Sequence, residues 1–264
     1  MYLARNIAQS PDPSSVAFGS LTLAQNVYDR PDFFKRYSQF PRSIHGLAGA
    51  PEWPEIRSML PKLAGLRVAD LGCGYGWFCR WARENGAASV LGLDLSEKML
   101  ARARAMTSDD GVTYSIADLE HLNIPIASFD LVYSSLAFHY VEDAARLFAS
   151  IYKSLVPGGH LVFTTEHPIF MASLNPGWRT ADDGHRLWPV DHYFVEGERK
   201  TDWLTSGVIK YHRTMATTLT SLQKAGFRIE QVKEFCPTTD QVAADPLLQE
   251  EIDRPTFLLI AAQK

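Results

Sequence analysis

The 264-residue sequence contains few cysteines and no long apolar run. Its three cysteines, Cys73, Cys79 and Cys236, are too few and too scattered for a disulfide framework or a Cys-x-x-Cys metal site. We therefore expect a reducing, cytoplasmic environment and no bound metal. No stretch of about eighteen consecutive apolar residues is present, and the N-terminus is polar, without a basic segment followed by an apolar run. These absences predict a chain that neither crosses a membrane nor carries an export signal.

The sequence also lacks an excess of positive charge. It has 26 Lys and Arg against 30 Asp and Glu, a formal net charge of -4 at pH 7, and its basic residues are dispersed. Nucleic-acid-binding proteins concentrate basic residues on one face, so DNA and RNA are not expected partners. With 46% apolar residues the chain can bury one sizeable core. We expect a single α/β domain over residues 1–264 that acts on a small molecule.

A glycine-rich turn is the most informative feature that is present. The apolar segment 68–71 leads into Gly72, Gly74 and Gly76. A dinucleotide-binding turn has its third glycine where this chain has Trp77, and an indole there would obstruct the close approach that a pyrophosphate needs. The Lys-Ser or Lys-Thr pair of a phosphate-binding P-loop is missing as well. The turn therefore suits a nucleoside without phosphates.

The middle of the chain alternates strands and helices, as expected for a parallel sheet. Apolar runs predict strands over 67–71, 89–93, 112–116, 129–134 and 160–165. Helical patterns are predicted over 77–85, 97–107 and 144–155, the second capped by Ser96 and the third ended by Pro157-Gly158-Gly159. A helix over 215–225 and two strands over 227–235 and 256–262 follow. We expect the last two strands to pair antiparallel.

Three segments differ from this alternation. Residues 1–25 mix Pro, Ser, Ala and Gln, which predicts a loosely held arm or a contact in a homodimer. Residues 25–61 are aromatic and interrupted by prolines, which predicts a helical cap over a site. Residues 167–213 are too long for an ordinary connection, so we expect a lid. The predicted parts are an arm and cap (1–60), a cofactor-binding core (61–166), the lid (167–213) and a C-terminal part (214–264).

Five motifs occur in the order and spacing of one enzyme superfamily. They are the turn over 68–76, the strand end over 92–96, the pair Ala117-Asp118, and the segments 129–132 and 155–159. Together they resemble the successive motifs of class I S-adenosylmethionine-dependent methyltransferases, over roughly residues 60–264. The resemblance implies a doubly wound, mostly parallel, seven-stranded Rossmann-like sheet of the α/β class, with the lid inserted after the fifth strand. It also implies S-adenosyl-L-methionine as the cofactor.

Acidic residues at strand ends are the main cofactor candidates. Asp94 lies about twenty residues beyond the glycines, where a carboxylate can accept hydrogen bonds from both ribose hydroxyls. The alternative is a carboxylate that only favours a helix dipole. The resemblance implies that Asp118 binds the adenine amino group and that Asp70 supports the turn and approaches the methionine moiety. The alternatives are a solvated loop acid at Asp118 and a purely structural role for Asp70.

Main-chain groups of the turn are a second kind of cofactor candidate. Gly72, Cys73 and Gly74 can bring them against the methionyl end, because glycine permits positive φ and close approach. The predicted set also includes residues adjoining the acids, namely Leu95, Ala117 and Leu119.

Five further side chains complete the cofactor candidates. Met99 is either a cover for the adenine or plain core. Tyr28 and Tyr37 of the cap are candidates to close over the methionine moiety. The resemblance implies that Ser134 and Ser135, at the end of the fourth strand, border the methyl donor.

Two histidines are candidates for catalysis. Methyl transfer depends chiefly on placing a nucleophile in line with the sulfonium carbon, with a base only if the nucleophile arrives protonated. His139 and His167 follow the fourth and fifth strands, at the edge where open α/β sheets bind ligands. Each is a candidate general base. The alternatives are a packing role for His139 and, for His167, a loop histidine that orders Glu166.

The predicted lid is rich in aromatic side chains, which suit a flat or apolar small molecule beside the donor. A hydrophobic cluster under a long loop, or a subunit interface, is the alternative. The substrate candidates are Trp178, Trp188, His192, Tyr193, Phe194, Trp203, Tyr211, His212 and Arg213.

The sequence thus predicts methyl transfer to a small molecule and leaves open whether the acceptor atom is oxygen, nitrogen or carbon. Residues 134–137 are Ser-Ser-Leu-Ala, where enzymes that methylate bases in nucleic acids often carry Asn or Asp-Pro-Pro-Tyr, which argues against base methylation. Two alternative functions remain. One is a methyltransferase fold that catalyses a cyclisation or another non-transfer reaction, and the other is a cofactor-binding protein without catalysis.

Overall fold

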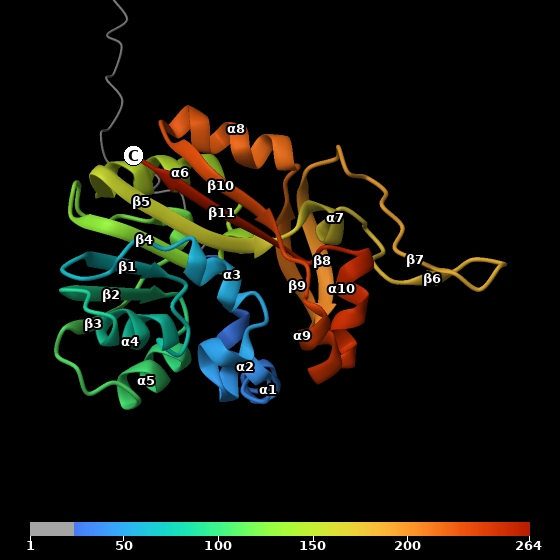
Figure 1. Ribbon diagram of the computed structural model, residues 1–264, viewed down its shortest axis with the longest axis horizontal. Coiled ribbons are helices and arrows are strands. Elements are labelled where there is room, and N and C mark those ends of the chain that lie inside the picture. Colours follow the sequence, from blue (N-terminus) through green and yellow to red (C-terminus); the bar gives the residue numbers. More distant parts are fainter. Residues whose placement is uncertain (1–23) are drawn as a thin grey trace, which may run out of the picture.

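The computed structural model describes residues 24–264, so nearly all of the arm expected over residues 1–25 lies outside the described part. Its parallel strands are β1 (Arg67–Leu71), β2 (Ser89–Asp94), β3 (Val112–Ile116), β4 (Phe129–Ser135) and β5 (Leu155–Glu166). β11 (Phe257–Gln263) lies antiparallel between β5 and β10 (Arg228–Glu234). The order in the seven-stranded sheet is β10-β11-β5-β4-β1-β2-β3 (Figure 1). The predicted mostly parallel α/β sheet is confirmed.

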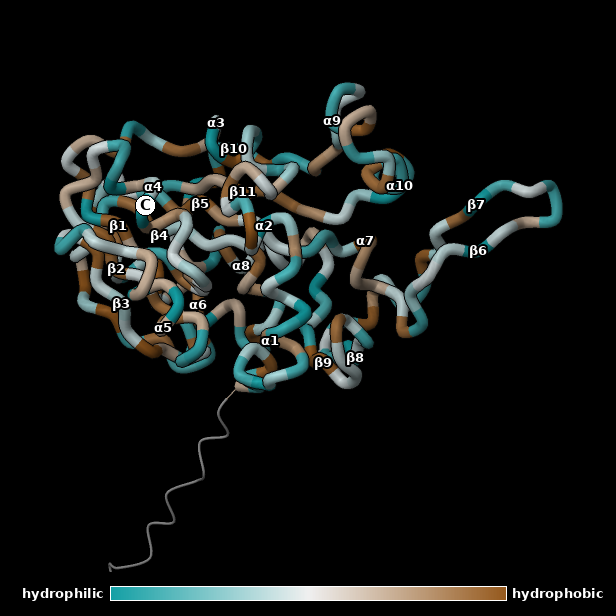
Figure 2. Tube along the Cα trace, turned by 90° about the horizontal axis from the view of Figure 1, so that it is seen from below, coloured by the Kyte–Doolittle hydropathy of each residue, from teal (hydrophilic) through white to brown (hydrophobic). Residues whose placement is uncertain are grey.

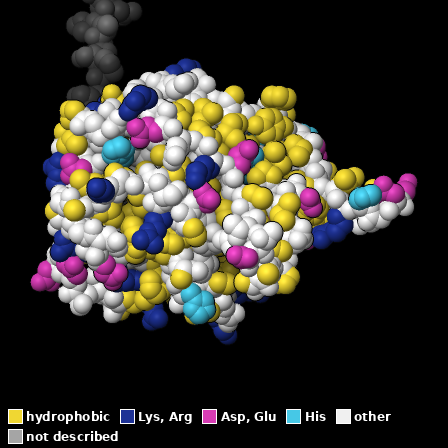
Figure 3. Space-filling model, viewed as in Figure 1, with side chains coloured by type: hydrophobic (Ala, Val, Ile, Leu, Met, Phe, Trp, Pro, Cys, Tyr) yellow, Lys and Arg dark blue, Asp and Glu magenta, His cyan; other side chains and the backbone are white. Residues whose placement is uncertain are grey.

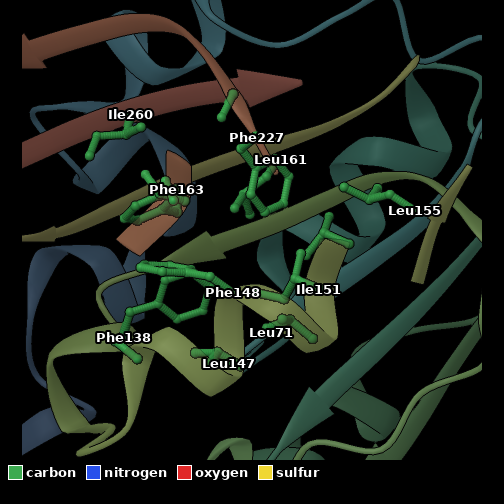
Figure 4. Packing of buried hydrophobic residues seen from close by; sticks show 14 of the residues in the cluster. Leu71, Phe138, Leu147, Phe148, Ile151, Leu155, Leu161, Phe163, Phe227 and Ile260 are labelled. Atoms are coloured by element: carbon green, nitrogen blue, oxygen red, sulfur yellow. The ribbon is translucent and has the colours of Figure 1, made fainter. Parts of the chain in front are cut away.

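Helices cover both faces of this sheet. α3 (Trp53–Ser58), α4 (Trp77–Glu84) and α5 (Glu97–Ala105) pack on one face, and α6 (Ala144–Ser154) and α8 (Met215–Ala225) on the other. Because successive strand residues point to opposite faces, Val68 belongs to the first cluster and Ala69 to the second. On the α6 face, Phe148 and Phe163 pack with ring centroids 5.7 Å apart (Figure 4). The doubly wound arrangement is therefore present.

The segment 155–159 differs from the prediction. The helix ends at Ser154 and β5 begins at once, so Pro157-Gly158-Gly159 lies inside the strand and not in a turn before it. The pairing with β4 shifts from Phe129–Leu155 to Leu131–His160, and Gly158 has a φ of +78°. A bulge with a left-handed glycine absorbs the additional residues of β5.

The cap consists of short helices that begin at prolines. α1 (Pro31–Tyr37) and α2 (Pro41–Ile44) start with proline, and α3 has Pro54 in its first turn. Proline lacks an N–H that the first helical residue would leave unpaired in any case, so these prolines start helices rather than only ending them. The turns η1 (Val27–Asp29) and η2 (Gly46–Gly49) complete the cap.

The lid segment contains a hairpin that the sequence analysis did not predict. β8 (Gly197–Trp203) and β9 (Thr205–His212) pair in a sheet of their own, and Val208 packs against Val27 and Phe33 of the cap. A smaller hairpin of β6 (Arg179–Thr180) and β7 (Arg186–Leu187) projects from the body (Figure 2). Its tip carries exposed acidic and histidine side chains, among them Asp183 and His185 (Figure 3).

Helical turns between β10 and β11 were also missed. They are α9 (Thr239–Ala244), η5 (Pro246–Gln249) and α10 (Glu250–Asp253). With α7 (Pro168–Met171), they lie at the same end of the sheet as the β8–β9 hairpin (Figure 1). In the part of the chain that the structure describes, no helix has the length and apolar character needed to cross a membrane.

Candidate active site

A cavity of about 1440 Å³ lies at the carboxyl ends of β1, β2, β4 and β5. Open parallel sheets bind their ligands at this edge. The cavity is lined by residues of the glycine turn, the cap, the β8–β9 hairpin and α9. Every predicted cofactor residue lines it except Ala117 and Ser134. The fold therefore brings segments that are far apart in the sequence to one site.

Two glycines of the turn fit its geometry. Gly72 and Gly74 have φ values of +77° and +53°, in the left-handed region that favours glycine. A Cβ at Gly72 would lie 2.4 Å from the Cβ of Ala137, whereas a Cβ at Gly74 would meet nothing within 4 Å. Gly72 thus allows the segment after β4 to pack against the turn, and Gly74 leaves open space at the cavity wall.

Asp94 holds the turn and retains capacity to accept hydrogen bonds. Its Oδ2 accepts the Gly74 N–H at 2.8 Å and its Oδ1 accepts the Ser96 N–H at 2.9 Å. A carboxylate has about four lone-pair positions, so about two remain for the two hydroxyls of a ribose. Burial raises the pKa of Asp94 to about 6, although these hydrogen bonds oppose the rise. The donors and acceptors at the turn therefore fit a nucleoside.

Asp118 lies on the same cavity wall. Its Oδ1 accepts the Glu120 N–H at 2.9 Å, and its Oδ2 accepts the Ala24 N–H at 3.2 Å. The segment that leads into the cap therefore contacts this acid directly. Three apolar candidates also line the cavity, namely Leu95, Met99 and Leu119.

Ala117 and Ser134, two of the predicted cofactor residues, do not line the cavity. Ala117 packs against the apolar cluster of the α6 face, and Ser134 is fully buried and donates its hydroxyl to the Leu71 carbonyl at 2.6 Å. Of the two serines named together, Ser135 lines the cavity and Ser134 does not, because neighbouring residues of a strand point to opposite faces.

Asp70 lies behind the turn and is 2% exposed. Its Oδ2 accepts a hydrogen bond from the Cys79 thiol at 3.2 Å. Burial raises the pKa of Asp70 to about 7, with the Cys79 hydrogen bond opposing the rise and Asp94 adding to it. Burial also raises the pKa of the Cys73 thiol to about 11. Cys73 is therefore a neutral thiol with little nucleophilic character.

Two tyrosines of the cap form an aromatic wall of the cavity. The rings of Tyr28 and Tyr37 meet edge to face, with centroids 5.2 Å apart, and the Tyr28 hydroxyl lies 3.3 Å from that of Tyr140. Burial raises the pKa of Tyr28 well above its usual value, so its hydroxyl stays protonated. This wall is therefore uncharged.

His139 lines the cavity from the turn η4 (Phe138–Tyr140). Arg213 holds this turn by donating hydrogen bonds to the carbonyls of Phe138 and Val141. Burial lowers the pKa of His139 to about 3, so the ring is neutral at physiological pH. Its Nδ1 accepts the Glu166 N–H at 3.4 Å, which leaves the ring proton on Nε2.

His167 lies apart from the cavity, although the sequence analysis made it a candidate base. Its Nδ1 accepts the Ile169 N–H at 3.1 Å and caps α7, and its Nε2 lies 2.8 Å from Glu234 Oε1. Both ring nitrogens are thus engaged. The alternation along β5 explains this position, because Glu166 lines the cavity and the next residue does not.

An ion pair on the cavity wall was not predicted. Lys210 of β9 is 3% exposed and donates to Glu166 Oε1 at 2.5 Å. Its ammonium lies 5.0 Å from the ring centroid of Trp203 and 5.9 Å from that of Tyr140. Burial acts to raise the pKa of Glu166, but the interactions with His139 and Lys210, including the Lys210 hydrogen bond, outweigh burial and hold the pKa below its usual value.

The predicted substrate residues of the lid divide into two groups. Trp178 and Trp203 line the cavity. The others do not, namely Trp188, His192, Tyr193, Phe194, Tyr211, His212 and Arg213. Trp178 and Trp188 also enclose the Arg254 guanidinium, at 5.5 and 4.5 Å from their ring centroids. Part of the aromatic content of the lid therefore serves packing.

Residues 69–163 match the model of the methyltransferase domain family. An S-adenosylmethionine-dependent methyltransferase from Mesorhizobium loti, whose crystal structure is known, is 62% identical, with a TM-score of 0.81 over 83% of this chain and 100% of that one. An uncharacterized protein of Haemophilus influenzae is 36% identical over 90% of this chain and 97% of its own length. A malonyl-[acyl-carrier protein] O-methyltransferase of Enterobacter lignolyticus is 38% identical over 48% of this chain and 50% of its own.

The fold and the site define a Rossmann-like methyltransferase of class I. The chain belongs to the S-adenosylmethionine-dependent methyltransferases, enzymes that take a methyl group from this cofactor. The predicted enzyme class and cofactor are thereby confirmed. Within residues 24–264, no three or more His, Cys, Asp or Glu side chains are grouped so that they could hold a metal ion.

Proposed function

We propose that this enzyme methylates a small molecule that binds in the same cavity as S-adenosylmethionine. The main support is the cavity itself, which has a volume of about 1440 Å³ and is lined by the cofactor turn as well as by the β8–β9 hairpin. Pockets for one small ligand usually have volumes of about 300–1,000 Å³. The space is therefore sufficient for a donor and an acceptor together.

The donor is proposed to bind at the turn. Asp94 accepts hydrogen bonds from the ribose hydroxyls, and Asp118 accepts one from the adenine amino group. Main-chain groups of Gly72 and Gly74 contact the methionyl end, and Asp70 supports the turn from behind. The positive φ of both glycines and the remaining acceptor capacity of Asp94 support these assignments.

The acceptor is proposed to bind between the cap and the β8–β9 hairpin. The side chains that border this part of the cavity are aromatic or deeply buried. Lys210 and His139 are each 3% exposed, and Trp203 and Tyr140 lie beside them. Groups this inaccessible can contact only a molecule small enough to enter the cavity. This favours a metabolite over a nucleic acid or a protein surface as the acceptor.

His139 is proposed to orient its neighbours and not to act as the base. The Nδ1 lone pair of its neutral ring already accepts the Glu166 N–H, and Nε2 lies 3.9 Å from Glu166 Oε1. The protonated Nε2 is therefore near the carboxylate, but at a distance too long for a hydrogen bond. No free lone pair remains on it for a substrate proton.

The proposal is tested with purified protein, methyl-labelled S-adenosylmethionine and a size-filtered metabolite extract. We expect label to appear in a small molecule, and the Asp94→Ala variant to lose both this transfer and binding of S-adenosylhomocysteine in calorimetry. Glu234→Gln, which changes an acid outside the cavity, is the control and should retain both. Cofactor binding without any transfer would instead favour the non-transfer reaction or the binding protein.

A further inference from the structure

The acceptor side of the cavity contains a carboxylate with one unused oxygen. Glu166 at the end of β5, Lys210 on β9 and His139 on η4 come from three elements and meet on the cavity wall. Glu166 Oε1 accepts a hydrogen bond from the Lys210 ammonium, while Oε2 is buried without a hydrogen-bond partner among residues 24–264. An unpaired buried carboxylate oxygen costs free energy, so a bound group that donates to it would be favoured.

Lys210 has donors to spare at the same place. An ammonium has three N–H donors, and one of them points to Glu166. The ammonium otherwise lies near the rings of Trp203 and Tyr140. The ion pair therefore offers a free acceptor and a free donor next to each other. A hydroxyl group satisfies both, because it donates one hydrogen bond and accepts others.

Other acceptor groups fit this pair less well. A neutral amine has one lone pair, which cannot both accept from Lys210 and attack the methyl carbon, whereas a hydroxyl oxygen has two. A carboxylate would be repelled by Glu166 and has no proton to donate to Oε2. A carbon nucleophile supplies neither the donor nor the acceptor. The ammonium would in addition stabilise negative charge as it develops on an attacking oxygen.

We propose, building on the proposed function, that the methyl acceptor is a hydroxyl group held between Glu166 Oε2 and Lys210 Nζ, with Glu166 as the catalytic base. An oxygen lone pair of the hydroxyl forms the bond to the methyl carbon. The carbon–sulfur bond of the donor breaks, and its electron pair stays on sulfur. The hydroxyl proton passes to Glu166 Oε2. The product is a methyl ether.

The position of the transferred methyl group tests this assignment directly. Protein is incubated with S-adenosylmethionine labelled with carbon-13 in its methyl group and with size-filtered metabolite extract, and the labelled product is examined by NMR and by alkaline hydrolysis. We expect a methyl on oxygen that resists hydrolysis. A methyl on nitrogen or carbon, or a hydrolysable methyl ester, overturns the hydroxyl assignment and leaves the proposed function standing. Absence of any labelled product overturns both.

Variants of the ion pair test the role of Glu166. With the isolated acceptor, Glu166→Gln should lower kcat by about 100-fold or more, the usual effect of losing a general base, while affinity for S-adenosylhomocysteine changes less than about twofold. Lys210→Met, which keeps the buried stem of the side chain, should lower kcat and shift the acidic limb of the pH–rate profile upward, because Glu166 loses the positive charge that lowers its pKa. Glu234→Gln is the matched control and should keep the wild-type rate.

A purely structural ion pair that fastens the hairpin to the sheet is the competing explanation. Removing one partner leaves the other charge buried and can unfold the protein, so the double variant Glu166→Gln with Lys210→Met is also needed. Because this variant buries neither charge, we expect it to fold, to bind S-adenosylhomocysteine and to remain as slow as Glu166→Gln. A folded double variant with the wild-type rate overturns the assignment.

Discussion

The hydroxyl of Ser96 donates a hydrogen bond to Asp29 Oδ1 at 2.5 Å, which fastens the cap to the loop after Asp94. Asp29 also accepts the Lys98 N–H at 3.1 Å, at the start of α5, where a carboxylate is favoured by the helix dipole. Burial acts to raise the pKa of Asp29, but the hydrogen bonds from Ser96 and Lys98 outweigh it, so the pKa is lowered. The cap therefore depends on a carboxylate next to the proposed ribose site.

Removal of this carboxylate should loosen the cap and weaken cofactor binding. In Asp29→Ala we expect the affinity for S-adenosylhomocysteine to fall by about fivefold, since a lost cap hydrogen bond costs roughly 1 kcal/mol. Calorimetry measures the change. Asp32→Ala alters an exposed acid of the same cap and should leave the affinity unchanged. Equal affinities for both variants would show that the cap is not coupled to the cofactor site.

Cofactor affinity should depend on the ionisation of Asp94. Burial raises the pKa of Asp94 to about 6, and in the proposed complex only its ionised carboxylate accepts both ribose hydroxyls. Below about pH 6 we expect the dissociation constant of S-adenosylhomocysteine to rise by up to about tenfold per pH unit. The measurement is best made in Asp70→Asn, which removes the neighbouring titration. A flat profile down to about pH 4 would refute the role of Asp94.

The stability of the Asp70→Asn variant relative to wild type should increase as the pH rises. Asp70 loses its proton near pH 3.8 in the unfolded chain and near 7 in the folded chain, so between these values the folded state holds more protons and the free energy of unfolding falls with rising pH. Asparagine does not titrate, so the variant does not undergo this fall in the free energy of unfolding. Between about pH 5 and 8, urea unfolding should show the variant gaining about 2 to 3 kcal/mol relative to wild type. A constant difference would mean that Asp70 keeps an ordinary pKa.

Alanine at Gly72 should cost more than alanine at a matched glycine. Gly72 and Gly158 have nearly equal φ values, +77° and +78°, but only at Gly72 would the new Cβ collide, 2.4 Å from Ala137. Gly158→Ala should cost about 1 kcal/mol for the left-handed backbone, and Gly72→Ala about 1 to 3 kcal/mol more. Ala137→Gly in the Gly72→Ala background should restore part of the loss, measured by urea unfolding.

His167→Ala should behave as a structural variant. Loss of its cap on α7 and its contact with Glu234 should lower stability by about 1 kcal/mol. The kcat should stay within about twofold of wild type, because the ring lies apart from the cavity. A large loss of kcat with normal stability would return His167 to the list of candidate bases.

Much of the core was predictable because its signals are local. The apolar runs of β1 and β4, the cap at Ser96 and the glycine turn each depend on neighbouring residues. Local signals also placed Asp94 on the cavity wall, and the family resemblance placed Asp118 there. They did not distinguish Ser134 from Ser135 or His167 from Glu166, because the side of the strand that faces the cavity decides which of two neighbours lines it. The predicted homodimer stays a prediction.

The β8–β9 hairpin was missed because the sequence of β8 is mostly polar, and contact with the cap rather than its own pattern favours the strand. A signal was present in β9, where Val208, Lys210 and His212 alternate and all three are buried. A lysine at a buried position of such a pattern calls for a charged partner. Its partner, Glu166, lies 44 residues away in the sequence, and only the fold brings them together.

The β8–β9 hairpin shares no strand ladder with the central sheet, and the family match ends at residue 163, before Glu166 and Lys210. In the proposed function, the matched stretch supplies most of the donor site, and the β8–β9 hairpin outside it supplies part of the acceptor site. Relatives can inherit the first and diverge in the second. Transplanting the segment 197–212 from one homologue to another should thus change which compound is methylated, while the affinity for S-adenosylmethionine stays the same.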